Sequence, residues 1–138
     1  MGCYNSAVIQ APVEKVWATL RNFHDFSWSA KVISKVETEG NPEQIGAKRV
    51  LNGVFFETLL ALDDVERKMR YSIDDGPDAV SKDNVAGYIG QIKVFPITDD
   101  NSTFVLWSSR WESGGEGTKE FCDPIYQAFL ADLQQHFA

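Results

Sequence analysis

A single carboxylate, Glu57, is the residue whose chemistry is easiest to argue from this sequence. It lies in residues 54–62, a segment with apolar residues on both faces of the expected strand. Because side chains alternate along a strand, Glu57, Leu59 and Ala61 share one face. A carboxylate among apolar neighbours either finds a cation or donor, or keeps its proton because its pKa is raised. A raised pKa would suit a general acid or base, or a hydrogen bond to a ligand hydroxyl.

A structural role for Glu57 is the alternative. The carboxylate could pair with a nearby basic residue, such as Arg49 or Lys31, and hold strands together. Both interpretations stay open on the sequence alone, because perturbed carboxylates occur at functional sites and in structural ion pairs alike.

Several hydroxyl and indole side chains could accompany this carboxylate. Tyr71, Tyr88 and Ser109 could orient a polar group of a ligand, or could be packed in the core with their hydroxyls bonded to backbone. Trp107 and Trp111 could supply flat walls for a ring or chain, or could simply be core residues.

No pattern in the sequence indicates a metal or a cofactor. The two histidines, His24 and His136, and the two cysteines, Cys3 and Cys122, have no metal-ligand spacing. There is no Gly-x-Ser-x-Gly elbow, phosphate loop or dinucleotide fingerprint. The glycine-rich residues 113–117 are typical of a flexible hinge. We therefore predict neither a metal site nor a cofactor.

The hydrophobic periodicity predicts the elements that must position these residues. A helix over residues 11–20 follows from the apolar stripe of Val13, Val16, Trp17 and Leu20, and the final helix begins near Thr118 or Asp123. A short helix or turn is expected over residues 23–28, and strands over residues 3–9, 32–39, 48–51, 54–62, 68–73, 85–95 and 103–112.

This order predicts one α+β domain over residues 1–138. Consecutive hairpins make a curved antiparallel sheet, and the long C-terminal helix must cover its apolar face. Two short helices follow the first strand. A sheet that curves strongly around one helix leaves a gap at its middle, which becomes a cavity.

Composition excludes several classes of partner. The chain has 138 residues, 43% of them hydrophobic, and a net charge of -7, which argues against nucleic acid and repels anionic membrane surfaces. No segment predicts stable membrane insertion and no leader is evident, so we expect a cytoplasmic protein. The sequence leaves the oligomeric state open.

The chain resembles the helix-grip superfamily of START-like proteins, particularly its bacterial polyketide cyclase and lipid-transport branch. The resemblance covers nearly the whole length. It is carried by the opening of the first helix, residues 11–17, by Trp28 and Val32, by residues 57–64, 67–73 and 88–96, and by Trp107 and Trp111.

The resemblance implies a Bet v1-like helix-grip fold with an internal cavity between the sheet and the C-terminal helix. In related hormone receptors the matching glutamate faces the pocket, which implies the same for Glu57. The ligand-binding side chains implied by this alignment are Glu57, Leu59, Ala61, Met69, Tyr71, Ile73, Tyr88, Gly90, Ile92, Trp107, Ser109, Trp111, Phe121, Ile125 and Phe129.

Superfamily members include carriers, receptors, cyclases and chaperone-activating modules, and a fold alone does not choose among them. The first hypothesis is binding of a small hydrophobic molecule, such as a lipid, polyketide or isoprenoid. The alternatives are a cyclase or dehydratase that uses Glu57 as acid or base, and a protein-interaction module with a filled cavity.

Overall fold

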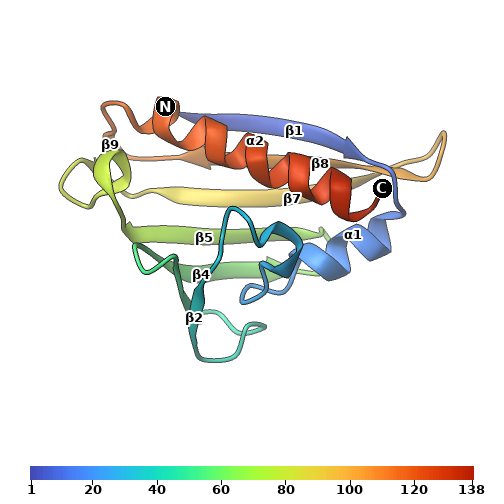
Figure 1. Cartoon of the computed structure of the whole chain (residues 1–138), viewed down its shortest axis with the longest axis horizontal. Coiled ribbons are helices and arrows are strands. Elements are labelled where there is room, and N and C mark those ends of the chain that lie inside the picture. The colour runs from blue at the N-terminus through green and yellow to red at the C-terminus, as the bar shows by residue number, and fades with distance from the viewer.

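The computed structural model describes residues 1–138 as a curved sheet with a long helix across one face (Figure 1). The elements in chain order are β1 (Gly2–Ile9), α1 (Val13–Leu20), the 3-10 turn η1 (Ser27–Ser29), β2 (Val36–Glu39), β3 (Lys48–Leu51), β4 (Phe55–Asp63), β5 (Lys68–Asp75), the 3-10 turn η2 (Asp78–Val80), β6 (Val85–Ala86), β7 (Ile89–Ile97), β8 (Ser102–Arg110), β9 (Ser113–Gly114) and α2 (Thr118–His136). This is the predicted α+β helix-grip architecture.

Seven strands form one antiparallel sheet in the order β1-β8-β7-β5-β4-β3-β2. Hairpins connect β2 through β5 and then β7 to β8, as the period-two pattern predicts. β1 pairs with β8 and forms the edge of the sheet opposite β2. The short β6 and β9 pair with each other. No helix in the structure is long and apolar enough to cross a bilayer.

The last helix begins at Thr118, so Pro124 lies inside it. Phe121, Ile125, Phe129 and Leu133 recur every four residues in this helix, but only the last two belong to its buried face. The fully buried residues are Thr118, Cys122, Tyr126, Phe129, Leu130 and Leu133, whereas Phe121 and Ile125 are only partly buried. The face that packs on the sheet is therefore rotated by about one residue, which brings Tyr126 into the interior.

Three expectations about the strands were wrong: two concerned boundaries and one the alternation of faces in β4. The strand expected over residues 32–39 begins only at Val36. The strand expected over residues 85–95 is interrupted at Gly87, whose φ of 69° lies in the left-handed region. In β4 a bulge between Leu59 and Ala61 shifts the alternation, so that Leu62, rather than Ala61, packs against the core.

A continuous cluster of 29 buried residues forms the core between the sheet and the helices. The four predicted positions of α1, Val13, Val16, Trp17 and Leu20, are all buried in it. The long helix α2 packs mainly against β1, η1 and η2. Its cover is thus thinner over β3 and β4, the opposite half of the sheet.

Gly90 allows one close approach inside this core. It is paired with Tyr71 across β5 and β7, and a Cβ added at Gly90 would lie 2.2 Å from Cζ of Tyr71. The tyrosine ring therefore lies directly over the glycine, and no larger residue fits there unless the ring moves.

We expect Gly90→Ala to lower the free energy of unfolding by about 1–3 kcal/mol, because the added methyl group overpacks the core. Urea denaturation measures this loss. In a Tyr71→Leu background, where the ring is absent, the same change should cost much less. Equal costs in the two backgrounds would contradict the close contact.

Candidate functional site

A small cavity lies between α2 and the inner face of β3, β4 and β5. Its volume is about 30 Å³, room for one or two water molecules. Most of its wall is apolar, with Arg49 and Glu57 as the charged exceptions. The wall consists of Phe26, Ile33, Arg49, Leu51, Phe55, Glu57, Tyr71, Ile73, Trp107, Cys122, Ile125, Tyr126 and Phe129.

The polar end of the cavity is a buried ion pair between neighbouring strands. Arg49 of β3 and Glu57 of β4 are register partners, so their side chains extend from the sheet side by side. Nε and Nη2 of Arg49 lie 2.8 and 2.6 Å from Oε1 of Glu57. The side chains are only 4% and 5% exposed, so water screens the pair little.

This pairing engages only one oxygen of the carboxylate. Oε1 of Glu57 takes both contacts with Arg49, and Oε2 makes no hydrogen bond within the protein. Because Glu57 lines the cavity, Oε2 is an acceptor that a bound molecule can use.

Arg49 also connects the sheet to the loop that follows α1. Its Nη1 donates to the carbonyl oxygen of Phe23 at 2.8 Å. The guanidinium carbon lies 4.0 Å from the ring centroid of Phe23, 4.9 Å from that of Phe26 and 5.0 Å from that of Tyr71. Such cation–π contacts help to stabilise a charge that has left water.

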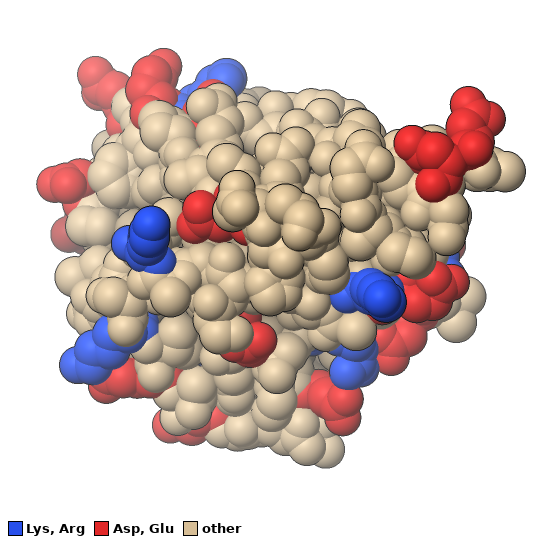
Figure 2. All heavy atoms as spheres, turned by 45° about the vertical axis from the view of Figure 1, so that its right-hand side comes forward, with Lys and Arg blue, Asp and Glu red and all other residues tan.

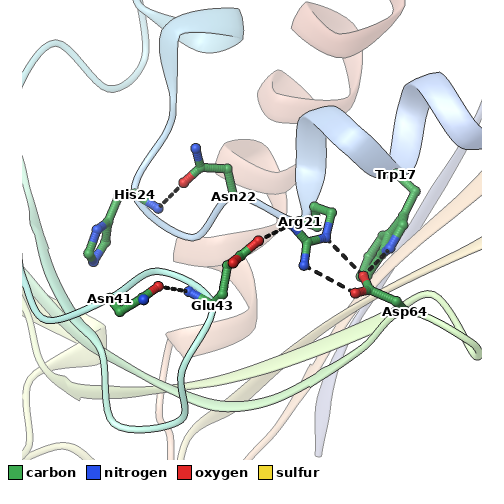
Figure 3. A network of polar contacts seen from close by, with 7 residues as sticks. All are labelled: Trp17, Arg21, Asn22, His24, Asn41, Glu43 and Asp64. Atoms are coloured by element: carbon green, nitrogen blue, oxygen red, sulfur yellow. Dashed lines mark hydrogen bonds and ion pairs between the residues drawn. The ribbon is translucent and has the colours of Figure 1, made fainter.

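A polar network holds this loop in place from outside (Figure 3). Arg21, at the end of α1, donates to Glu43 and Asp64, and Trp17 Nε1 donates to the same Asp64 carboxylate. His24 Nε2 lies 3.0 Å from the carbonyl oxygen of Lys48, next to Arg49 in β3. These contacts fix the loop relative to β3 and hence the carbonyl that Arg49 reaches.

Phenol groups form the second polar cluster, at the α2 side of the cavity. Trp107 Nε1 donates to Tyr71 Oη at 2.9 Å, and Tyr71 Oη donates to Tyr126 Oη at 3.4 Å. Tyr88 and Tyr126 are hydrogen-bonded through their hydroxyls. Burial raises the pKa of Tyr71, Tyr88 and Tyr126 above the usual value, so these phenols stay neutral and can donate.

The pKa of Glu57 reflects two opposing effects. Burial raises it above its ordinary value, because the charged form loses water, and the nearby Arg49 guanidinium offsets part of this rise. A carboxyl group with a raised pKa can exchange a proton nearer to neutral pH than an exposed glutamate can.

The predicted site residues divide into two groups. Six line the cavity: Glu57, Tyr71, Ile73, Trp107, Ile125 and Phe129. The structure places the other nine outside its wall: Leu59, Ala61, Met69, Tyr88, Gly90, Ile92, Ser109, Trp111 and Phe121.

Packing explains where most of these nine residues lie. Leu59, Met69 and Ile92 are buried in the core, and Gly90 lies beneath Tyr71. The bulge in β4 displaces Ala61. Phe121 packs against Phe55, with ring centroids 6.4 Å apart.

Two of the three polar members of this group, Ser109 and Tyr88, form hydrogen bonds within the protein. Ser109 Oγ accepts from the backbone of Cys3 at 3.3 Å, and the Tyr88 hydroxyl bonds to Tyr126. Trp111 stacks on Tyr88 with ring centroids 5.7 Å apart. Only Ser109 thus bonds to backbone, and the buried Nε1 of Trp111 has no hydrogen-bond partner.

Sequence reasoning missed seven wall residues: Phe26, Ile33, Arg49, Leu51, Phe55, Cys122 and Tyr126. Arg49 had been considered only as a possible partner of Glu57. Cys122, Tyr126, Phe129 and Leu133 recur at helical spacing, so a wider choice of stripe on the last helix would have found two of the seven.

Comparison with known proteins identifies the family. Residues 3–138 match the family described as polyketide cyclase / dehydrase and lipid transport. The chain belongs to this family. No curated protein matches the chain.

Solved structures share the fold. A protein from Nitrosospira multiformis is 42% identical, with a TM-score of 0.96 over 100% of this chain and 97% of that one. The protein XoxI from Bacillus cereus is 25% identical, with a TM-score of 0.79 over 99% and 94% of the two chains. A protein from Thermobifida fusca, 21% identical with a TM-score of 0.81 over 99% and 92%, shows the fold alone.

Removing one partner of the buried pair should be costly. We expect Arg49→Met to lower the free energy of unfolding by about 3–5 kcal/mol, because it leaves a buried carboxylate without a cation. Urea denaturation of Arg49→Met/Glu57→Leu is the matched control and should recover most of the loss. A double variant no more stable than Arg49→Met would contradict this account of the pair.

The raised pKa of Glu57 predicts a pH dependence of stability. A raised pKa means that the folded state binds the proton more tightly than the unfolded chain. The stability that Glu57 contributes by titration is therefore fully present below its ordinary pKa of 4.5 and is lost as the pH rises toward the folded-state value.

We expect the free energy of unfolding of the wild type, minus that of Glu57→Gln, to decrease between about pH 4 and about pH 7. Urea denaturation at a series of pH values measures the difference. An increase over this range would show that Arg49 outweighs burial and lowers the pKa.

Proposed function

We propose that this protein binds a small hydrophobic molecule carrying a hydrogen-bond donor, such as a hydroxylated lipid, polyketide or isoprenoid. The observation that carries the proposal is the Glu57 carboxylate, which bonds to Arg49 through Oε1 alone and lines a mostly apolar cavity. A ligand hydroxyl that donates to this carboxylate would form a charge-assisted hydrogen bond in surroundings where water screens it little. The family description, with its lipid transport, agrees with such a role.

The apolar wall would supply most of the affinity. Burial of apolar surface contributes roughly 25 cal/mol per Å². Phe26, Trp107 and Phe129 offer flat faces, and the ring centroids of Trp107 and Phe129 are stacked 5.0 Å apart. The neutral phenols of Tyr71 and Tyr126 would orient a second polar group.

Entry of such a ligand requires side chains to move, because the cavity volume is only about 30 Å³. The partly buried wall residues Phe55, Ile73 and Ile125 are the ones with room to move. They lie on β4, β5 and α2, where the helix covers the sheet least. We place the entrance there. The two free thiols, Cys3 and Cys122, fit a cytoplasmic carrier or sensor.

A matched pair of probes tests the hydroxyl preference. We expect 1-naphthol to bind about tenfold more tightly than naphthalene, because only naphthol donates to Glu57. Tryptophan fluorescence titration measures both constants. In Glu57→Gln the preference should shrink, because a neutral acceptor replaces a charged one. Equal affinities in the wild type would contradict the role given to Oε2.

Cavity-filling variants test the location of the site. We expect Ile125→Trp to abolish naphthol binding, because the larger side chain occupies the wall. Val8→Trp, at an exposed position of β1, is the control and should bind like the wild type. Undiminished binding in Ile125→Trp would place the ligand elsewhere.

An enzyme of the cyclase or dehydratase kind is the second candidate, favoured by the raised pKa of Glu57. In this role the carboxylate would take a proton from carbon next to a ligand carbonyl. NMR measures the rate of deuterium exchange into 1-phenylbutane-1,3-dione with the protein and in buffer alone. The excess rate that the protein causes should then depend on Glu57. Exchange that persists unchanged in Glu57→Gln would exclude this chemistry at Glu57.

A further inference from the structure

A second hollow lies on the outer face of the sheet, away from the cavity. Its volume is about 170 Å³. Its six lining residues, of which only Ile89 is hydrophobic, are Arg70, Ile89, Gln91, Ser108, Ser109 and Arg110. Figure 2, turned 45° from the view of Figure 1, shows acidic and basic side chains scattered over the surface, and no acidic residue lines this hollow.

The strand register brings these polar side chains together. Arg70, Gln91 and Ser108 are direct neighbours across β5, β7 and β8. Arg110 lies two residues beyond Ser108 on the same strand and therefore on the same face. The neighbouring Trp107 faces the cavity, so the hollow and the cavity lie on opposite faces.

Neither arginine of the hollow is neutralised by the protein. Arg70 and Arg110 form no ion pair, although the chain has 20 acidic and 13 basic residues. Arg70 Nε donates to Gln91 Oε1 at 2.7 Å, which fixes the guanidinium group and leaves its Nη atoms unbonded. Ser108 also lines the hollow, separated from Arg70 by Gln91 in the register and from Arg110 by one residue along β8.

We propose that this hollow binds the phosphate group of a soluble small molecule. Two guanidinium groups provide several N–H donors in planar arrays, which match phosphate oxygens well. The Ser108 hydroxyl offers a further donor in the same hollow. The volume exceeds that of a phosphate group, so part of an attached molecule fits as well. This site is separate from the hydrophobic cavity and does not depend on the function proposed for it.

Titration with inorganic phosphate at constant ionic strength tests the proposal. We expect saturable shifts of the Nε–Hε signals of Arg70 and Arg110 in nitrogen-15 NMR spectra of the full chain. Arg70→Gln and Arg110→Gln should each weaken phosphate binding about tenfold or more, because each removes charge-assisted hydrogen bonds. Arg67→Gln removes the same charge outside the hollow, on the turn before β5, and should change affinity less than about twofold.

Unchanged backbone spectra would confirm that all three variants are folded, since the three side chains lie outside the hydrophobic core. Linear shifts without saturation, or equal losses in Arg67→Gln and Arg70→Gln, would overturn the proposal. Sedimentation with phosphatidic acid vesicles separates the sources of the phosphate group. Binding to these vesicles without saturable binding of inorganic phosphate would assign the hollow to a membrane surface and overturn the soluble ligand.

Discussion

The buried contact between Arg49 and Glu57 is the interaction on which the arrangement of the cavity depends. It joins two adjacent strands through their side chains, and the same guanidinium reaches the carbonyl oxygen of Phe23 in the loop after α1. One side chain therefore sets the position of the sheet, the loop and the polar end of the cavity together. The rings of Phe23, Phe26 and Tyr71 lie around it, with centroids 4.0, 4.9 and 5.0 Å from the guanidinium carbon.

A buried ion pair by itself adds little to the free energy of unfolding, because well-packed apolar residues of similar volume often give equal or greater stability. Its asymmetry is the informative feature. Arg49 engages Oε1 and leaves Oε2 without a hydrogen bond, while three neutral phenols and an indole form their own network. The cavity thus combines one strong acceptor with several donors in an apolar wall. Recognition sites for small molecules typically have this composition.

Much of the fold followed from periodicity and turn chemistry. The stripe of α1, the alternation in β5, β7 and β8, and the single long helix at the end were all predicted. The cavity wall was harder, because it depends on features without local signals. The bulge after Leu59 reverses the faces of β4, and the roll of α2 that buries Tyr126 is set by packing. Arg49 as the partner of Glu57 was one of two possibilities, and only the register of β3 with β4 decides between them.

Native mass spectrometry of the protein, purified under mild conditions, tests the central claim most directly. The account predicts a species with the mass of the chain plus one small molecule, whose measured composition is mainly hydrocarbon with at least one hydroxyl group. That species should be lost on addition of excess 1-naphthol. Repeated preparations that contain only the bare chain, together with no adduct after addition of naphthol, would contradict a ligand-binding cavity and favour an interior filled by its own side chains.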